Sequence, residues 1–245
     1  MTTDEAGPSR SGNRRRQYAL IAGGLVVALV VVGVVIALTR DDGGESRSAP
    51  ATTTTTAPTS TTGAPVDTST AVWPFASSAT RYSDPVAAAR GFAVDFVGFT
   101  DPIVGEFRQG DSRSGEVGVQ AKAGTVETTV LVRKLGDSWW VLGASTPNIQ
   151  PTAPTTSQAI SSPVALRGTS TAFEATVNVR VREDGKLAAL GEGFVMGGGN
   201  GEMGPFDATL AFSAPTASAG SVMLYQLSAE DGRVVEATVV RVKFA

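Results

Sequence analysis

An uncharged apolar segment near the amino terminus constrains the fold of this chain more than any other feature. Residues 19–39 read ALIAGGLVVALVVVGVVIALT and contain no charged side chain. A helix of about 20 residues is about 30 Å long, which matches the hydrocarbon thickness of a bilayer. Because lipid offers no hydrogen-bond partners to the backbone, a spanning segment must be helical even where it is rich in valine. The sequence therefore predicts a single transmembrane helix over residues 19–39.

The charges that flank this segment predict its orientation. Arg14, Arg15 and Arg16 precede it, and Arg40 follows it together with acidic residues. Positive charges are enriched on the cytoplasmic side of membrane spans, so we expect residues 1–18 in the cytoplasm and the rest outside the cell membrane. A cleaved signal peptide is the alternative, but its apolar region would be shorter and would end in a small-residue cleavage site. Small residues at four-residue spacing within the span leave a homodimer as an open alternative.

The segment that follows the span has the composition of a stalk. Residues 40–72 are rich in threonine and proline and include an unbroken run of threonine at 52–56. Because this segment has too little apolar surface to offset the conformational entropy lost on folding, we expect it to be a disordered, extended stalk. Serine, threonine and proline also dominate O-glycosylated stalks, which leaves glycosylation as an open addition.

The chain contains neither cysteine nor histidine. Their absence excludes disulfides, Ser–His–Asp and Cys–His catalytic groups, and zinc or haem sites built on these residues. The net charge of −3, with both signs interspersed, provides no basic surface for nucleic acid. We therefore expect a non-enzymatic protein without a cofactor or a nucleic-acid partner. A hydrolase that uses paired carboxylates on an envelope polymer is the alternative function.

Residues 73–146 are expected to form a small α+β module. Ser83 is predicted as the N-cap of a helix, with Asp84 in its first turn and Pro85 near its first position. The apolar face of this helix comprises Val86, Ala89, Phe92, Ala93 and Phe96. The following segments 116–121, 126–135 and 138–144 read as strands of an antiparallel sheet on which that face packs.

Two adjacent tryptophans in the last of these strands are candidate partner-binding residues. Neighbouring side chains in a strand point to opposite faces, so one of Trp139 and Trp140 should join the core and the other should lie outward. An exposed indole would offer a platform for a sugar or a peptide.

After a predicted linker at 147–157, residues 158–245 show the two-residue period of β-strands. In one run Phe173, Ala175, Val177, Val179 and Val181 alternate with polar side chains. About seven short strands separated by turns favour an immunoglobulin-like β-sandwich. The predicted fold class is therefore mainly β: one transmembrane helix, a small α+β module and a sandwich.

Several short motifs of this module occur together in a known family. They are Ser162, Pro163 and Val164, then Gly168, then Phe173, Glu174 and Ala175, then Asp184 and Gly185, then Gly204, Pro205 and Phe206, and finally Glu230, Asp231 and Gly232. At these positions the module resembles the immunoglobulin-like domain associated with bacterial spore germination proteins. The resemblance implies a module for binding or assembly in the cell envelope, and it implies no catalytic residues.

One glycine-rich loop matches a nucleotide-binding pattern without its context. Gly199, Gly201 and Gly204 have the spacing of a dinucleotide site, but Pro205 and an alternating strand follow where that site needs a helix. We therefore expect no bound nucleotide. As a loop at one end of the sandwich, the segment 196–205 is a candidate partner contact.

Together these features predict a membrane-anchored, extracytoplasmic binding or scaffolding protein of the bacterial cell envelope. Its expected partner is peptidoglycan or an envelope protein, in sporulation, germination or cell-wall assembly. The candidate contact residues are Trp139, Trp140, Met196, Asn200 and Met203.

Overall fold

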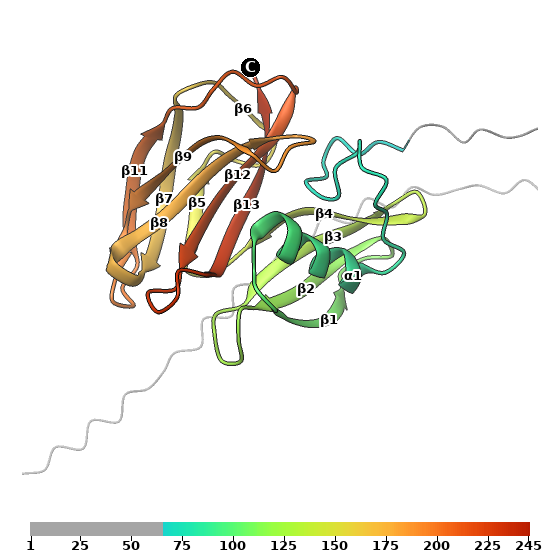
Figure 1. Cartoon of the computed structure of the whole chain (residues 1–245), viewed down its shortest axis with the longest axis horizontal. Coiled ribbons are helices and arrows are strands. Elements are labelled where there is room, and N and C mark those ends of the chain that lie inside the picture. The colour runs from blue at the N-terminus through green and yellow to red at the C-terminus, as the bar shows by residue number, and fades with distance from the viewer. Residues whose placement is uncertain (1–65) are drawn as a thin grey trace, which may run out of the picture. The chain divides into compact units, whose positions relative to one another are not determined.

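The computed structural model describes residues 66–245, and β-strands dominate this part of the chain (Figure 1). The predicted cytoplasmic tail, the predicted span at 19–39 and the first part of the predicted stalk lie outside the described residues. Between residues 66 and 245, none of the helices has the length and apolar character that a bilayer crossing requires. The expectation of a mainly β fold is thus confirmed for residues 66–245, and the membrane span stays a prediction.

The elements form two sheets, one helical segment made of α1 and η1, and a short 3-10 turn. They are α1 (Pro85–Gly91), η1 (Phe92–Val97), β1 (Ile103–Gln109), β2 (Ser114–Gln120), β3 (Thr128–Leu135), β4 (Ser138–Ser145), β5 (Ile149–Ala153), β6 (Gln158–Ile160), β7 (Val164–Ala172), η2 (Phe173–Ala175), β8 (Thr176–Glu183), β9 (Ala189–Met196), β10 (Gly198–Gly199), β11 (Gly204–Leu210), β12 (Ala219–Leu227) and β13 (Val234–Phe244). The larger sheet has the order β1-β2-β3-β4-β13-β12-β8-β9, with β6 paired to β13. The smaller sheet has the order β10-β7-β11, with β5 also paired to β7.

The helical segment begins one residue later than the sequence predicts. Asp84 is the N-cap: its backbone is extended, and its carboxylate accepts a hydrogen bond from the Ala87 N–H at 2.8 Å. Pro85 occupies the first helical turn, where its fixed φ suits the helix and its missing N–H costs nothing. The predicted cap, Ser83, therefore lies just outside the helix. After α1 the segment continues as the π-helix η1 and ends at Gly98, whose φ is +97°.

The helical segment packs on β2, β3 and β4, as the sequence analysis expects (Figure 1). Its buried side chains are Ala88, Ala89, Phe92, Ala93, Phe96 and Val97. The sheet contributes Val117, Val119, Val130, Val132 and Val141 to the same core. Val86 is only partly buried at the rim of this core. The alternating burial along β3 follows the predicted two-residue period.

The C-terminal module is a sandwich of two sheets. Val177, Val179 and Val181 of β8 are buried on its inner side, as the alternation predicts. They share a core with Leu166 of β7 and Phe206 of β11 in the facing sheet.

Phe173 departs from the predicted pattern. It lies in the short 3-10 turn η2 rather than in β8, and 58 % of its surface is exposed. The next two residues, Glu174 and Ala175, have positive φ angles of 53° and 58°, which reverse the chain before β8 begins. Because the turn breaks the strand, Phe173 points away from the core that it was expected to join.

The hairpin of β12 and β13 belongs to two cores. Met223 and Tyr225 pack with the helical segment and β2–β4, whereas the alternate residues Val222 and Leu224 pack inside the sandwich. β13 shows the same alternation, with Val239 on the first side. Both faces of the hairpin are therefore buried, and the two modules share it as a common wall.

The structure also revises two expected boundaries. The predicted linker 147–157 contains β5, in which Ile149 is 1 % exposed and pairs with Ser170 of β7. β5 is an edge strand, where Pro151 is tolerated because no ladder hydrogen bond is lost. At the other boundary, Val72 of the predicted stalk is buried and donates a backbone hydrogen bond to Val141 at 2.8 Å.

Two acidic side chains fix the turn that follows β8. The carboxylate of Asp184 forms a two-point ion pair with Arg241, in which one pair of atoms lies 2.7 Å apart. Glu183 accepts hydrogen bonds from the Lys186 ammonium and from the backbone N–H groups of Thr216 and Ala217. These donors, Lys186 foremost, lower the pKa of Glu183 to about 2.

Candidate functional site

The two predicted tryptophans lie on opposite faces of β4. Trp139 is half-buried and packs edge-on against Phe107, with ring centroids 5.2 Å apart. Trp140 is only 3 % exposed. Neither indole is therefore the fully exposed platform that the sequence suggested.

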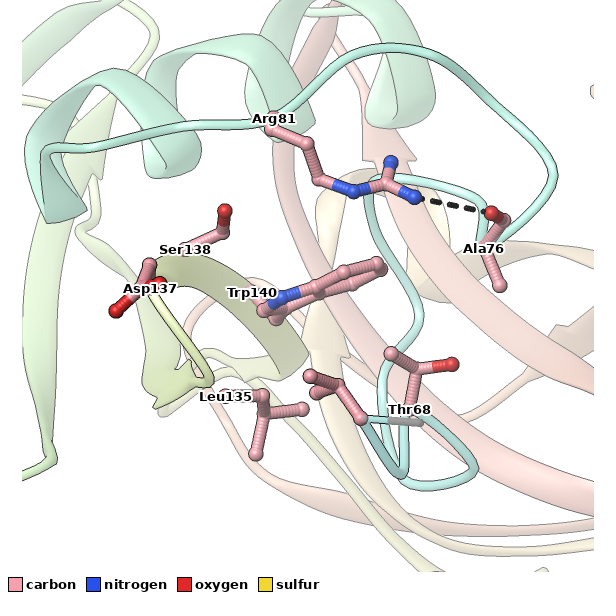
Figure 2. Close-up of a pocket in the computed structure, with 8 residues that line it drawn as sticks. Thr68, Ala76, Arg81, Leu135, Asp137, Ser138 and Trp140 are labelled. Carbon is pink, nitrogen blue, oxygen red and sulfur yellow. Dashed lines mark hydrogen bonds between the residues drawn. The ribbon is translucent and has the colours of Figure 1, made fainter. Parts of the chain in front are cut away.

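Trp140 instead forms one wall of a cavity of about 450 Å³, here called the Trp140 pocket (Figure 2). Residues from the β3–β4 hairpin line one side, and residues from the segment before α1 line the other. The lining comprises Val66, Thr68, Ala76, Arg81, Leu135, Asp137, Ser138 and Trp140. The pocket thus joins side chains that are about 60 residues apart in the sequence.

Arg81 is held rigidly over the ring of Trp140. Its guanidinium donates to the backbone carbonyls of Ala76, Ser78 and Thr80 at 3.1, 2.7 and 2.6 Å. The guanidinium carbon lies 4.9 Å from the centroid of the indole, which is cation–π distance, and Figure 2 shows the two groups facing each other. Because the carbonyls fix this cation before any ligand arrives, it needs little further ordering on binding.

The indole N–H of Trp140 has no hydrogen-bond partner among the described residues. A buried donor without a partner costs roughly 1–3 kcal/mol, and this nitrogen has almost no surface open to the cavity. In Figure 2 the nitrogen edge of the ring lies toward Asp137 and Ser138, which supply a carboxylate and a hydroxyl. The pocket therefore combines donors, an acceptor and a fixed cation, a set that suits a polar ligand with several hydrogen-bonding groups.

The predicted loop residues do not form one site. Met196 and Met203 are 54 % and 45 % exposed, and neither lines a described cavity. Asn200 lines a cavity of about 350 Å³ together with Phe173 and Gln226. The structure thus brings Asn200 toward Phe173 and leaves the two methionines on open surface.

The glycines of this loop serve close packing. A Cβ at Gly198 would lie 2.1 Å from the carbonyl oxygen of Glu202 and 2.2 Å from the nitrogen of Gly204. β10 pairs with β7 through Gly198 and Gly199, and β11 rather than a helix follows the loop. The chain therefore lacks the helix N-terminus that a dinucleotide phosphate needs at this loop.

A third cavity contains a residue that the sequence analysis missed. This space of about 390 Å³, here called the Glu236 cavity, borders the previous one and shares Asn148, Phe173 and Gln226 with it. Glu236 of β13 lines it and is 2 % exposed. The available signal was an acidic residue inside the apolar run of β13, where Val234, Ala237 and Val239 are buried.

No group of three or more acidic side chains within residues 66–245 is arranged to hold a metal ion. The Trp140 pocket includes one carboxylate among its described lining residues, that of Asp137. Glycoside hydrolysis by the usual route needs a pair of carboxyl groups about 5–10 Å apart. The lining of this pocket does not supply such a pair.

Comparison with known protein families gives a match to the C-terminal module. Residues 148–233 match the model of a family described as the immunoglobulin-like domain of bacterial spore germination. The match begins just before β5 and ends just before β13, so it assigns β5 to the same module as the structure does. The resemblance predicted from the sequence motifs is thereby confirmed. No curated protein matches the chain. No solved structure matches it either.

Proposed function

We propose that this protein, whose residues 148–233 match the family model of the immunoglobulin-like domain of bacterial spore germination, is a membrane-anchored binding or scaffolding protein of the cell envelope. Its described part would lie outside the membrane and bind peptidoglycan through the Trp140 pocket. The family match supports a binding role in a germination-related setting. The anchor and the orientation rest on residues 14–40 of the sequence.

The observation that carries this proposal is the guanidinium of Arg81, fixed over the Trp140 ring in a cavity that both residues line. A site in which aromatic and polar groups converge in a preformed cavity is typical of small-ligand recognition. Peptidoglycan offers both hydroxyl and carboxylate acceptors for Arg81 and for the Ser138 hydroxyl. Its hydroxyl and amide hydrogens are complementary donors for Asp137.

A sedimentation assay tests this proposal. Full-length protein in detergent is mixed with purified peptidoglycan sacculi, and the bound fraction is measured after centrifugation. We expect Asp137→Asn and Trp140→Phe to weaken binding at least tenfold. The matched control Asp95→Asn, an exposed carboxylate on the helical segment, should bind as the wild type does. Equal binding by all variants would exclude the Trp140 pocket as the peptidoglycan site.

The predicted topology has its own test. Protease added to intact cells should remove the described part of the chain and leave the amino-terminal tail protected. Protection of the described part would place it on the cytoplasmic side and overturn the proposed location.

The alternative function is a carboxylate-dependent hydrolase of an envelope polymer. It is motivated by the proposed location, and one carboxylate in the Trp140 pocket does not support the two-carboxylate mechanism. Release of soluble muropeptides from sacculi by the purified protein would favour this alternative over binding alone.

A further inference from the structure

Glu236 is a buried carboxylate that accepts hydrogen bonds from three neutral groups. The Thr146 hydroxyl donates to Oε2, and the Asn148 amide donates to Oε1 at 3.1 Å. With its amide oriented so that both ends are satisfied, Gln226 donates to Oε1 at 2.8 Å. All three neighbours donate, which is the arrangement that an ionised carboxylate requires.

The negative charge of Glu236 has no positive partner in the described part of the chain. Each ion pair within 4 Å between residues 66 and 245 is made by an acidic residue other than Glu236. A buried charge without a counter-charge is costly, and neutral hydrogen bonds compensate it only in part. An incoming cation would therefore gain more at this carboxylate than at an exposed one.

Glu236 also retains an acceptor position. A carboxylate has about four lone-pair sites, and the three donors leave about one of them free, on Oε2. A guanidinium frequently binds a carboxylate through two parallel N–H groups, and this two-point mode needs both oxygens. An ammonium group needs a single contact point, so the remaining site suits an ammonium better.

An exposed aromatic residue, Phe173, lines the same cavity. Its backbone N–H donates at 2.8 Å to the Gln226 amide that also contacts Glu236. The ring is held outward by the positive φ angles of Glu174 and Ala175, a strained conformation that tends to persist at functional sites. Gln226 thus links a buried carboxylate to an exposed π face, and both groups attract a cation.

We propose that the Glu236 cavity binds the protonated primary amine of a lysine-type peptide side chain. The ammonium would pair with Glu236 and lie against Phe173, while the methylene stem would contact Val126, Leu227 and Val235 of the lining. A cavity of about 390 Å³ accommodates one such side chain. This site is separate from the Trp140 pocket, and the inference does not depend on binding there.

Side-chain amide resonances provide a local readout. Full-length protein labelled with ¹⁵N in asparagine and glutamine is titrated in detergent with Nα-acetyl-lysine methylamide. We expect the side-chain resonances of Asn148 and Gln226 to shift. The uncharged isostere Nα-acetyl-norleucine methylamide should bind at least tenfold more weakly. Equal shifts with norleucine, or no lysine-dependent shift at these two amides, would overturn the proposal.

Two further ligands test the chemical class. Nα-acetyl-arginine methylamide should bind more weakly than the lysine compound, because one free acceptor site cannot satisfy a two-point fork. Glucosamine carries an ammonium on a sugar ring without a methylene stem, and it should also bind more weakly. Tighter binding of the arginine compound or of glucosamine would show that the assignment to a lysine-type side chain is wrong.

Variants locate the site. Glu236→Gln preserves the size of the side chain and removes the charge, and we expect it to weaken lysine binding at least tenfold. Phe173→Ala lies on the surface, so it tests the aromatic contact even if Glu236→Gln fails to fold, and it should weaken binding severalfold. The matched controls are Glu106→Gln and Phe194→Ala, which change exposed residues outside the cavity. Unchanged binding by Phe173→Ala, or an equal loss in the controls, would contradict the site.

Discussion

The shared β12–β13 hairpin predicts that the two modules unfold together. Leu224 is fully buried and faces the sandwich core, on the opposite side of β12 from Met223. Leu224→Ala should therefore destabilise both modules, although Leu224 packs in the sandwich core.

The magnitude follows from the burial of the side chain. Leu224→Ala removes three carbon atoms, each worth about 0.8 kcal/mol when buried, and leaves a cavity that adds to the loss. We expect the free energy of unfolding to fall by about 3 kcal/mol. With a urea dependence of about 2 kcal/mol per M, the midpoint of unfolding should fall by about 1.5 M.

The tryptophans make the assay specific. All three tryptophans, Trp73, Trp139 and Trp140, lie in the α+β module, so their fluorescence reports on the module that the substitution does not touch. Far-UV circular dichroism reports on strands of both modules. We expect the fluorescence and dichroism transitions of the purified variant to shift by the same amount.

A matched substitution provides the control. Leu187→Ala changes a leucine of the same module that is 47 % exposed. Its free energy of unfolding should change by no more than about 0.5 kcal/mol. If Leu224→Ala shifted the dichroism signal but left the fluorescence midpoint unchanged, the modules would unfold separately. The shared wall would then not couple them.

Three further predictions concern buried polar groups and a glycine. The pKa of Glu183 is about 2 when folded and near 4.5 ordinarily, so its contribution to stability is present above about pH 5 and declines as the pH falls toward 2. Chemical unfolding at several pH values should show that Glu183→Gln lowers the free energy of unfolding at pH 7 and that this loss becomes smaller toward pH 2. A loss that stays constant with pH would contradict the prediction. Arg241→Lys should lose the two-point pair with Asp184 and about 2 kcal/mol of stability in thermal unfolding, and an unchanged melting temperature would show that the pair contributes little. Gly198→Ala should cost about 2 kcal/mol or more because its Cβ would overlap backbone atoms, whereas Gly105→Ala, with no atom closer than 3.4 Å, should cost no more than about 1 kcal/mol of unfolding free energy.

Sequence periodicity predicted the strands that have one buried and one solvated face. β3 follows the expected alternation because a single core lies on one side of it. β8 does so as far as Val181, after which Arg182 and Glu183 are buried as well. β1 was not predicted, since it is an edge strand in which no residue is fully buried and no apolar period develops. β5 was read as linker because prolines, which an edge strand tolerates, dominated its local signal.

The candidate sites were less predictable than the strands. Trp140 was identified from its type, but the pocket depends on Arg81 and on the chain before α1, which are distant in sequence. Glu236 reads as one acid in an apolar strand, and its significance depends on Thr146, Asn148 and Gln226 from other strands and loops. Such convergence is a property of tertiary packing, so local patterns carry no information about it.

The position of the shared hairpin in the sequence has a consequence for biogenesis. Residues 219–244 follow every other strand of both cores, and synthesis proceeds from the amino terminus. While the ribosome is still adding these residues, each core lacks the same two strands. A chain that stalls before Val234 has β12 but lacks β13, and it therefore leaves the apolar interiors of both modules exposed. Synthesis of β13 completes the hairpin and covers both interiors.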